Sequence, residues 1–152
     1  MFLASLGAAA QPSAELEEDL RIIAQHWNML RVYGSGHPTD EILRIIRDEQ
    51  LPLIVMLGAW ISADDSELNA SEVEAAITLA NAYPDQVVAV NVGNETQVFW
   101  SGHRSPREDL IGYIREVRGA IAQPVTTADD YNFWNKEESY AVAHEVDFLL
   151  LH

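Results

Sequence analysis

The chain has 152 residues, the length of one ordinary domain, and 48% of them are apolar, which is enough to bury a core. Twenty-four acidic residues outnumber nine basic ones, giving a formal charge of −15, so no basic stripe is available for a nucleic acid or an anionic membrane. No apolar run reaches the roughly 18 residues of a transmembrane helix, and residues 1–10 form no clear secretory signal, so the compartment stays open. The lack of cysteine excludes disulfides and thiolate metal sites.

The first half of the chain alternates between helical and strand patterns. Apolar residues recur with helical spacing up to Trp27 and predict a helix, and the apolar run over residues 29–33 predicts a strand after it. After a break rich in glycine and proline, Thr39 offers an N-cap for a second helix. The continuous apolar run over residues 52–57 is typical of a parallel strand buried on both faces.

The second half repeats this alternation. Ser71 and Glu74 have the spacing of a capping box, which predicts a helix from there to about Tyr83. A second doubly buried strand is predicted over residues 87–92, and Ser105 precedes a helix that ends near residue 122. Two more short strands are predicted at residues 124–127 and 146–151, on either side of a weaker helix at 135–143.

Five strands joined by helices predict a parallel sheet in an α/β domain. Two architectures fit, a doubly wound open sheet and part of a (β/α)₈ barrel. The barrel could only be partial, because a complete one usually needs about 250 residues. The last strand runs to His152 with no loop or helix after it, although a parallel strand should deliver its C-terminal end to the functional face. We therefore expect residues 1–152 to form a single, incomplete TIM-barrel domain.

The sequence contains no convincing motif for binding a nucleotide cofactor or a metal ion. Gly34-Ser-Gly36 begins like a dinucleotide-binding loop, but Thr39 replaces the third glycine and Pro38 intrudes, so a tight turn fits better. The five histidines have no paired metal-ligand spacing, and the acidic residues 64–67 are typical of a solvated loop. We expect neither a metal nor an organic cofactor.

The most informative segment is the end of the strand over residues 87–92. Gly93, Asn94 and Glu95 follow it, so a carboxylate and an amide are placed at the rim where barrel enzymes keep their chemistry. A carboxyl group in this position suits general acid catalysis, and aromatic rings beside it suit a sugar. The alternative is that Glu95 is a solvated carboxylate in a loop and that the aromatic rings serve only for packing. The rings near strand ends are Tyr33, Trp60, Phe99, Trp100, Tyr131 and Trp134.

Five segments stand in the order and approximate spacing of one known family, namely Arg31–Gly34, Ile54–Trp60, Val90–Glu95, Pro124–Asp129 and Asp147–His152. Together they resemble the bacterial form of glycoside hydrolase family 17, which comprises β-1,3-glucanases and glucanosyltransferases. The resemblance implies a (β/α)₈ barrel whose second to sixth strands are the five predicted here. It also implies a β-glucan as the binding partner.

The resemblance assigns roles to individual residues. Glu95 matches the general acid/base at the end of the fourth strand, and Asn94 matches the asparagine that binds the sugar 2-hydroxyl. Arg31 is expected to support the carboxylates electrostatically. The substrate-binding residues expected in this cleft are Tyr33, Trp60, Arg31, Tyr131, Trp134 and His152.

One required group is missing from this pattern. A retaining glycosidase needs a second carboxylate about 5 to 5.5 Å from the acid, and in this family it lies on the seventh strand. We expect that strand, the eighth and the first to be absent, leaving a fragment of a β-1,3-glucan hydrolase or transglycosylase that is inactive in isolation. The alternative is a non-catalytic half-barrel that binds glucan or another chain. Open edges at residues 29–33 and 146–151 would favour self-association.

Overall fold

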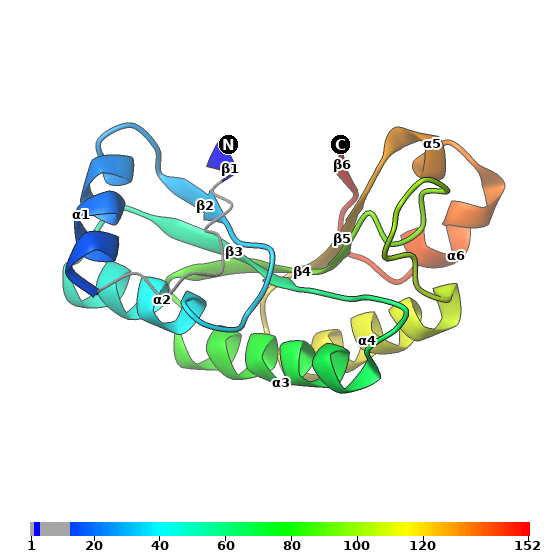
Figure 1. Ribbon diagram of the computed structural model, residues 1–152, viewed down its shortest axis with the longest axis horizontal. Helices are drawn as coiled ribbons and strands as arrows, with labels where there is room; N and C mark the ends of the chain where they lie inside the picture. The colour runs from blue at the N-terminus through cyan, green and yellow to red at the C-terminus, as the bar shows by residue number, and fades with distance from the viewer. Residues whose placement is uncertain (1, 4–12) are drawn as a thin grey trace.

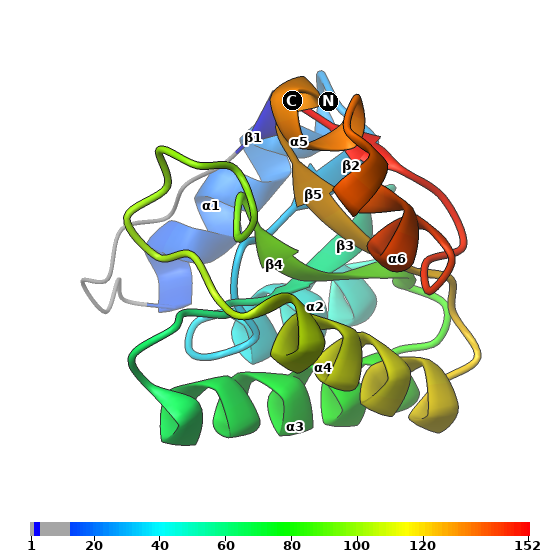
Figure 2. The ribbon, with the colours of Figure 1, turned by 90° about the vertical axis from the view of Figure 1, so that its right-hand side faces the viewer.

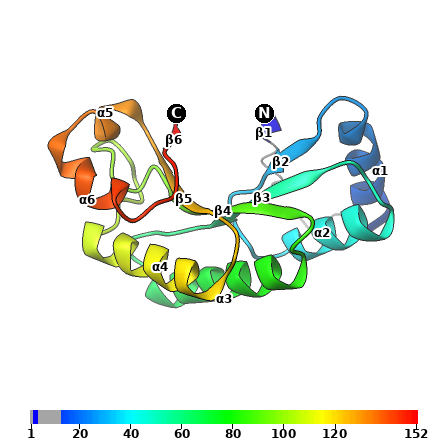
Figure 3. The ribbon, with the colours of Figure 1, turned by 180° about the vertical axis from the view of Figure 1, so that it is seen from behind.

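The computed structural model describes residues 2–3 and 13–152. Within these residues it contains one parallel sheet in which the strands follow one another in chain order. Figure 1 shows that the sheet is curled, with β1 and β6 at its two separated ends, and Figure 3 shows the same arrangement from behind. The strands are β1 (Phe2–Leu3), β2 (Met29–Arg31), β3 (Ile54–Ala59), β4 (Val87–Asn94), β5 (Val125–Asp129) and β6 (Leu150–Leu151).

Helices cover the outer, convex side of this sheet. Figure 2 shows α3 and α4 packed below the strands, with α5 and α6 beside β5. This arrangement confirms the predicted partial TIM barrel, in which right-handed crossovers place helices outside a parallel sheet. The helices are α1 (Ser13–Ala24), α2 (Thr39–Asp48), α3 (Ser66–Ala82), α4 (Arg107–Ala120), α5 (Tyr131–Trp134) and α6 (Tyr140–Ala143), with a 3₁₀ turn, η1, at Glu137–Ser139.

The central strands are buried on both faces, as their apolar runs predict. On β4, Val90 and Val92 belong to the core beneath the helices, while their neighbours Ala89 and Asn91 are buried as well. Since successive side chains of a strand point to opposite faces, both sides of β4 are covered. The helices contribute the other half of this core through apolar faces such as Leu43 of α2 and Ile114 of α4. Within the described residues, no helix is long and apolar enough to span a membrane.

The ends of the sheet differ from the prediction. The first strand is present, because Phe2–Leu3 pairs in parallel with β2, which is therefore not an edge. At the other end β6 covers only Leu150–Leu151, and residues 146–149 are bends and loop. Two-residue strands carry too little side-chain pattern to be read from a sequence.

Two predicted helix starts are wrong. Helix α3 begins at Ser66, because the Asp65 carboxylate accepts a hydrogen bond from the Leu68 N–H at 2.9 Å and caps the helix there. Ser71 consequently lies inside α3. Thr39 is the first residue of α2 rather than its cap, and its hydroxyl donates to the Gly34 carbonyl at 2.8 Å. The weak helix predicted over residues 135–143 is a 3₁₀ turn, η1, followed by α6, and α5 lies just before this range.

Close approach of β2 and β3 requires glycine at position 58. A Cβ atom there would lie 2.4 Å from the carbonyl carbon and oxygen of Tyr33. We predict that Gly58→Ala destabilises the chain by about 3 kcal/mol, the upper end of the usual overpacking range, because backbone cannot yield. Gly112→Ala is the matched control, since a Cβ on this exposed glycine of α4 meets nothing within 4 Å. That control should gain about 0.5–1 kcal/mol, and equal urea midpoints for the two variants would contradict the prediction.

Candidate active site

The candidate site lies where β4 ends. Asn94 is the last residue of β4, and the Glu95 N–H continues the pairing with β5 by donating to the Ala128 carbonyl at 2.8 Å. Gly93 and Glu95 both have positive φ, +78° and +50°. A left-handed backbone at a non-glycine residue is uncommon and costs free energy, so the neighbouring contacts must hold the turn in place.

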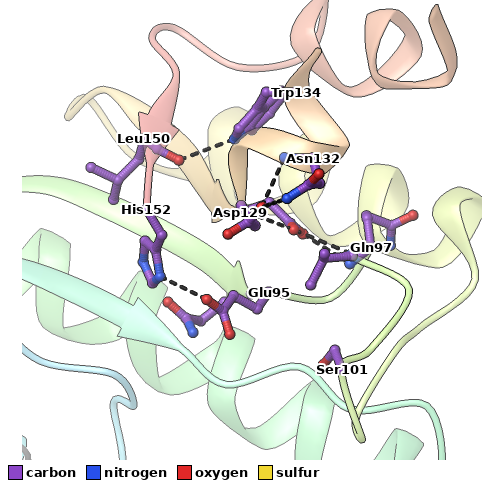
Figure 4. A network of polar contacts seen from close by, with 12 residues as sticks. Glu95, Gln97, Ser101, Asp129, Asn132, Trp134, Leu150 and His152 are labelled. Carbon is purple, nitrogen blue, oxygen red and sulfur yellow. Dashed lines mark hydrogen bonds and ion pairs between the residues drawn. The ribbon is translucent and has the colours of Figure 1, made fainter. Parts of the chain in front are cut away.

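A chain of polar contacts connects the ends of β2, β4 and β6. The buried Arg31 guanidinium donates to Asn94 Oδ1 at 2.6 Å and lies 3.1 Å from His152 Nε2. The other ring nitrogen, Nδ1, lies 2.9 Å from Glu95 Oε1. Figure 4 marks this contact between His152 and Glu95 with a dashed line. Residues 31, 94, 95 and 152 are thus brought to one place by three strands.

Arg31 fixes the orientation of the Asn94 amide. An arginine has donors only, so the oxygen of the Asn94 amide must face it. The nitrogen of the same amide then remains available to donate to a ligand. Arg31 is 1% exposed, and this burial lowers the pKa of its guanidinium, while Tyr33 and Glu95 raise it. The group stays a cation, because arginine is not deprotonated in proteins. Its guanidinium carbon lies 4.8 Å from the centre of the Tyr33 ring, a cation–π contact.

Asp129, at the end of β5, anchors the loop that follows Glu95. Its carboxylate accepts from the backbone N–H groups of Gln97 at 2.8 Å, Val98 at 3.2 Å and Asp130 at 2.8 Å. Burial raises the pKa of Asp129, and the three N–H donors lower it. Because the pKa is raised, the folded chain binds this proton more tightly than the unfolded chain, and ionisation costs stability as pH rises through it.

We predict that Asp129→Asn destabilises the chain by about 1–3 kcal/mol at neutral pH. In the carboxylate, each of the two oxygens accepts a hydrogen bond from a backbone N–H. An amide has only one oxygen, so its NH₂ group would face one of these N–H donors and leave it without an acceptor. Asp85→Asn, at an exposed position, is the control and should change the free energy of unfolding by less than about 0.5 kcal/mol. Two indistinguishable denaturation curves would show that Asp129 does not anchor the loop.

His103 connects the same loop to Trp60. Its Nε2 lies 2.6 Å from the Asn94 carbonyl oxygen, and its ring centre lies 4.6 Å from that of the half-buried Trp60. The loop over residues 96–105 is thereby held against the strand end that carries Glu95.

Glu72 of α3 holds the loops after β2 and β3. Its carboxylate accepts from the N–H groups of Ser35 at 2.7 Å, Gly36 at 3.2 Å and Trp60 at 3.1 Å. A Cβ on Gly34 would lie only 3.0 Å from this carboxylate. The turn that begins like a phosphate loop is therefore a tight turn whose donors bind an internal carboxylate, which agrees with the preferred interpretation of the sequence.

The two remaining predicted binding residues lie apart from this network. Trp134 donates its indole N–H to the Leu150 carbonyl at 3.2 Å, so it supports β6. Tyr131 is 56% exposed, and no contact within the described residues joins it to Glu95. The described residues contain no cluster of three or more histidine or acidic residues that could hold a metal ion.

Sequence reasoning missed three of the supporting residues, Glu72, His103 and Asp129. Asp129 had a usable signal, since it ends a buried strand just as Asn94 does. Glu72 and His103 had none, because their partners lie far away along the chain or in a loop.

The chain is similar to known glycoside hydrolases. Residues 5–152 match the model of the BtgE/BtgC glycoside hydrolase domain. An endo-laminarinase from Formosa Hel1_33_131 superposes with a TM-score of 0.82 at 28% identity, over 93% of this chain and 45% of that one. No match was found among curated proteins.

A second solved structure shows the same fold. The glycoside hydrolase family 17 β-1,3-glucanosyltransferase from Rhizomucor miehei superposes with a TM-score of 0.79 at 21% identity, over 99% of this chain and 55% of that one. The chain thus spans about half the length of the solved proteins it matches. These matches confirm the predicted resemblance to family 17, and the family model covers nearly every residue. The chain belongs to the BtgE/BtgC glycoside hydrolase domain family.

Proposed function

We propose that the chain carries the acid/base side of a retaining β-1,3-glucan hydrolase or transglycosylase, with Glu95 as general acid/base. The observation that carries this proposal is the network at the carboxyl ends of β2, β4 and β6, which fixes Asn94 and Glu95 side by side. The rim formed by these ends is where barrel enzymes act.

In this proposal each residue of the network has one task. Glu95 protonates the glycosidic oxygen as the leaving sugar departs, then removes a proton from the water or sugar hydroxyl that replaces it. Asn94 donates its amide N–H to the sugar 2-hydroxyl, since its oxygen is held by Arg31. The nucleophilic carboxylate, about 5 to 5.5 Å from the acid in a retaining enzyme, comes from the part of the barrel that follows β6 in longer relatives.

The proposed substrate rests on the relatives and on two aromatic rings. One matching structure is an endo-laminarinase, and another is a β-1,3-glucanosyltransferase in complex with laminaritriose. In this chain Tyr33 lies against Arg31 and Trp60 against His103, so both rings stand beside the Glu95 network. Flat aromatic faces pack well against the C–H groups of a sugar ring.

Titration of the 152-residue chain with laminaritriose, followed by two-dimensional NMR, tests this proposal. The resonances of residues 33, 60, 94 and 95 should shift, and Trp60→Ala should weaken binding about tenfold, equivalent to about 1.4 kcal/mol. Trp27→Ala is the matched control and should leave the affinity unchanged. Shifts confined to other surfaces, or equal effects of the two variants, would contradict the proposal. Binding without turnover in a complete barrel would instead indicate the non-catalytic glucan-binding alternative.

We also predict that the isolated chain self-associates as salt rises. The β6 end of the sheet exposes Phe148, Leu149 and Leu151, and edge strands pair readily with other edges. The charge of −15 opposes association at low salt, and salt screens it over about 10 Å at 0.1 M. Light scattering from about 0.02 to 0.5 M NaCl should show growing particles, and Leu151→Lys should suppress them. A monodisperse monomer throughout would contradict the prediction.

A further inference from the structure

The ring of His152 lies between a group that only donates hydrogen bonds and a group that accepts them. Its Nε2 is 3.1 Å from the Arg31 guanidinium, and its Nδ1 is 2.9 Å from Glu95 Oε1. Because a guanidinium has no acceptor, Nε2 must supply the lone pair and the ring hydrogen must sit on Nδ1. A hydrogen on Nε2 would point at an Arg31 N–H, so the contact with Arg31 disfavours every form of the ring that carries one.

We propose that His152 is a positioning residue for Glu95, held by Arg31 as the Nδ1–H tautomer so that it donates to Oε1. This inference rests on the proposed function, and it specifies which carboxyl oxygen does the chemistry. With Oε1 engaged by an N–H donor, the catalytic proton is carried on Oε2, which faces the glycosidic oxygen of a bound glucan. The sequence suggested that His152 binds substrate, and in this proposal it acts through Glu95.

Several features of the site require such a contact. Glu95 begins the loop with a left-handed backbone, and its side chain is about one-third exposed. An exposed glutamate samples several rotamers, and fixing them costs conformational entropy. Among the described residues, the other charged group in contact with this ring is Arg31, which itself lies against the Tyr33 ring. The donor on Oε1 thus comes from His152, while Arg31 sets its tautomer.

His103 provides an internal control within the same site. Its Nε2 lies 2.6 Å from the Asn94 carbonyl oxygen, an acceptor, and its Nδ1 lies 3.3 Å from the Ser101 hydroxyl. The structure therefore assigns His103 the Nε2–H tautomer, opposite to that of His152. His103 and His152 both contact residues at the end of β4, and a single spectrum should show them as different tautomers.

The first test uses the 152-residue chain and does not depend on activity. Long-range ¹H–¹⁵N correlation spectra of ¹⁵N-histidine-labelled chain at neutral pH should show protonated Nδ1 for His152 and protonated Nε2 for His103. Arg31→Met should return His152 to a mixture of tautomers, while Arg44→Met, at an exposed position of α2, should not. If Arg31→Met does not fold, the wild-type spectrum alone decides. An Nε2–H or doubly protonated His152 overturns the proposal, even if the proposed function is correct.

The second test separates positioning of the acid from mere structure. In a chain that includes the rest of the barrel, His152→Phe should lower kcat on laminarin by about 10- to 100-fold, the cost of misplacing a catalytic group by about 1 Å. A dinitrophenyl glucoside, whose leaving group needs no proton, should lose less than about threefold in glycosylation. His152→Asn, whose amide N–H replaces Nδ1–H, should restore laminarin turnover. Equal losses of activity on both substrates, or no recovery of laminarin turnover in His152→Asn, overturn the proposal. A Glu95→Gln substitution that leaves turnover unchanged would contradict the proposed function instead.

Discussion

Replacing Glu95 by glutamine, in a chain that includes the rest of the barrel, is expected to lower turnover of β-1,3-glucan by about 10²- to 10⁴-fold. Glutamine keeps the size of the side chain and an oxygen that accepts from His152, but it has no proton to transfer. The leaving sugar would then depart as an alkoxide, and the attacking water or hydroxyl would lose its general base. Stability should change little, because Glu95 is partly exposed.

Reducing-sugar release from laminarin and thermal unfolding of the same preparations measure this effect. Glu116→Gln, at an exposed position of α4, is the matched control and should retain full activity and full stability. A Glu95→Gln enzyme with unchanged turnover would identify Glu95 as an ordinary rim carboxylate.

The 152-residue chain by itself is expected to release no reducing sugar from laminarin. A double displacement needs a second carboxylate to attack the anomeric carbon. The carboxylate at the neighbouring strand end, Asp129, is 1% exposed and already accepts three backbone N–H groups. It is occupied in holding a loop and cannot take the nucleophile's place.

Assays of the chain with and without a separately produced second half of the barrel test this expectation. Turnover should arise only in the mixture, and Glu95→Gln in the first half should abolish it. Reducing sugar released by the 152-residue chain alone, and lost with Glu95→Gln, would show that the site is complete within these residues.

The sequence predicted the interior of the fold better than its boundaries. Strands β3 and β4 were recognisable because burial on both faces demands unbroken apolar runs. Strand β1 was missed, and β6 was predicted too long, because two residues carry no periodicity. The start of α3 was misplaced because both Ser71 and Asp65 are residues that can cap a helix. Only the folded chain shows that Asp65 does so.

For the site, strand-end position and family resemblance were enough to select Asn94 and Glu95. Arg31 and His152 were also selected by the family resemblance, but the contacts that join them to Asn94 and Glu95 were not recoverable from the sequence. Arg31 and His152 are 121 residues apart, and Glu72 bonds to a turn 37 residues before it. Such pairs are created by the curl of the sheet, which no local pattern encodes.

The central claim, that Glu95 is the acid/base of a retaining enzyme, is tested most directly by azide rescue. In a chain with the complete barrel, Glu95→Ala should still form the glycosyl-enzyme from a dinitrophenyl β-glucoside, because that leaving group needs no acid. Azide, occupying the space left by the carboxylate, should then displace the enzyme and yield the β-glycosyl azide with a faster rate. An α-glycosyl azide would make Glu95 the nucleophile, and absence of any azide product would contradict the account.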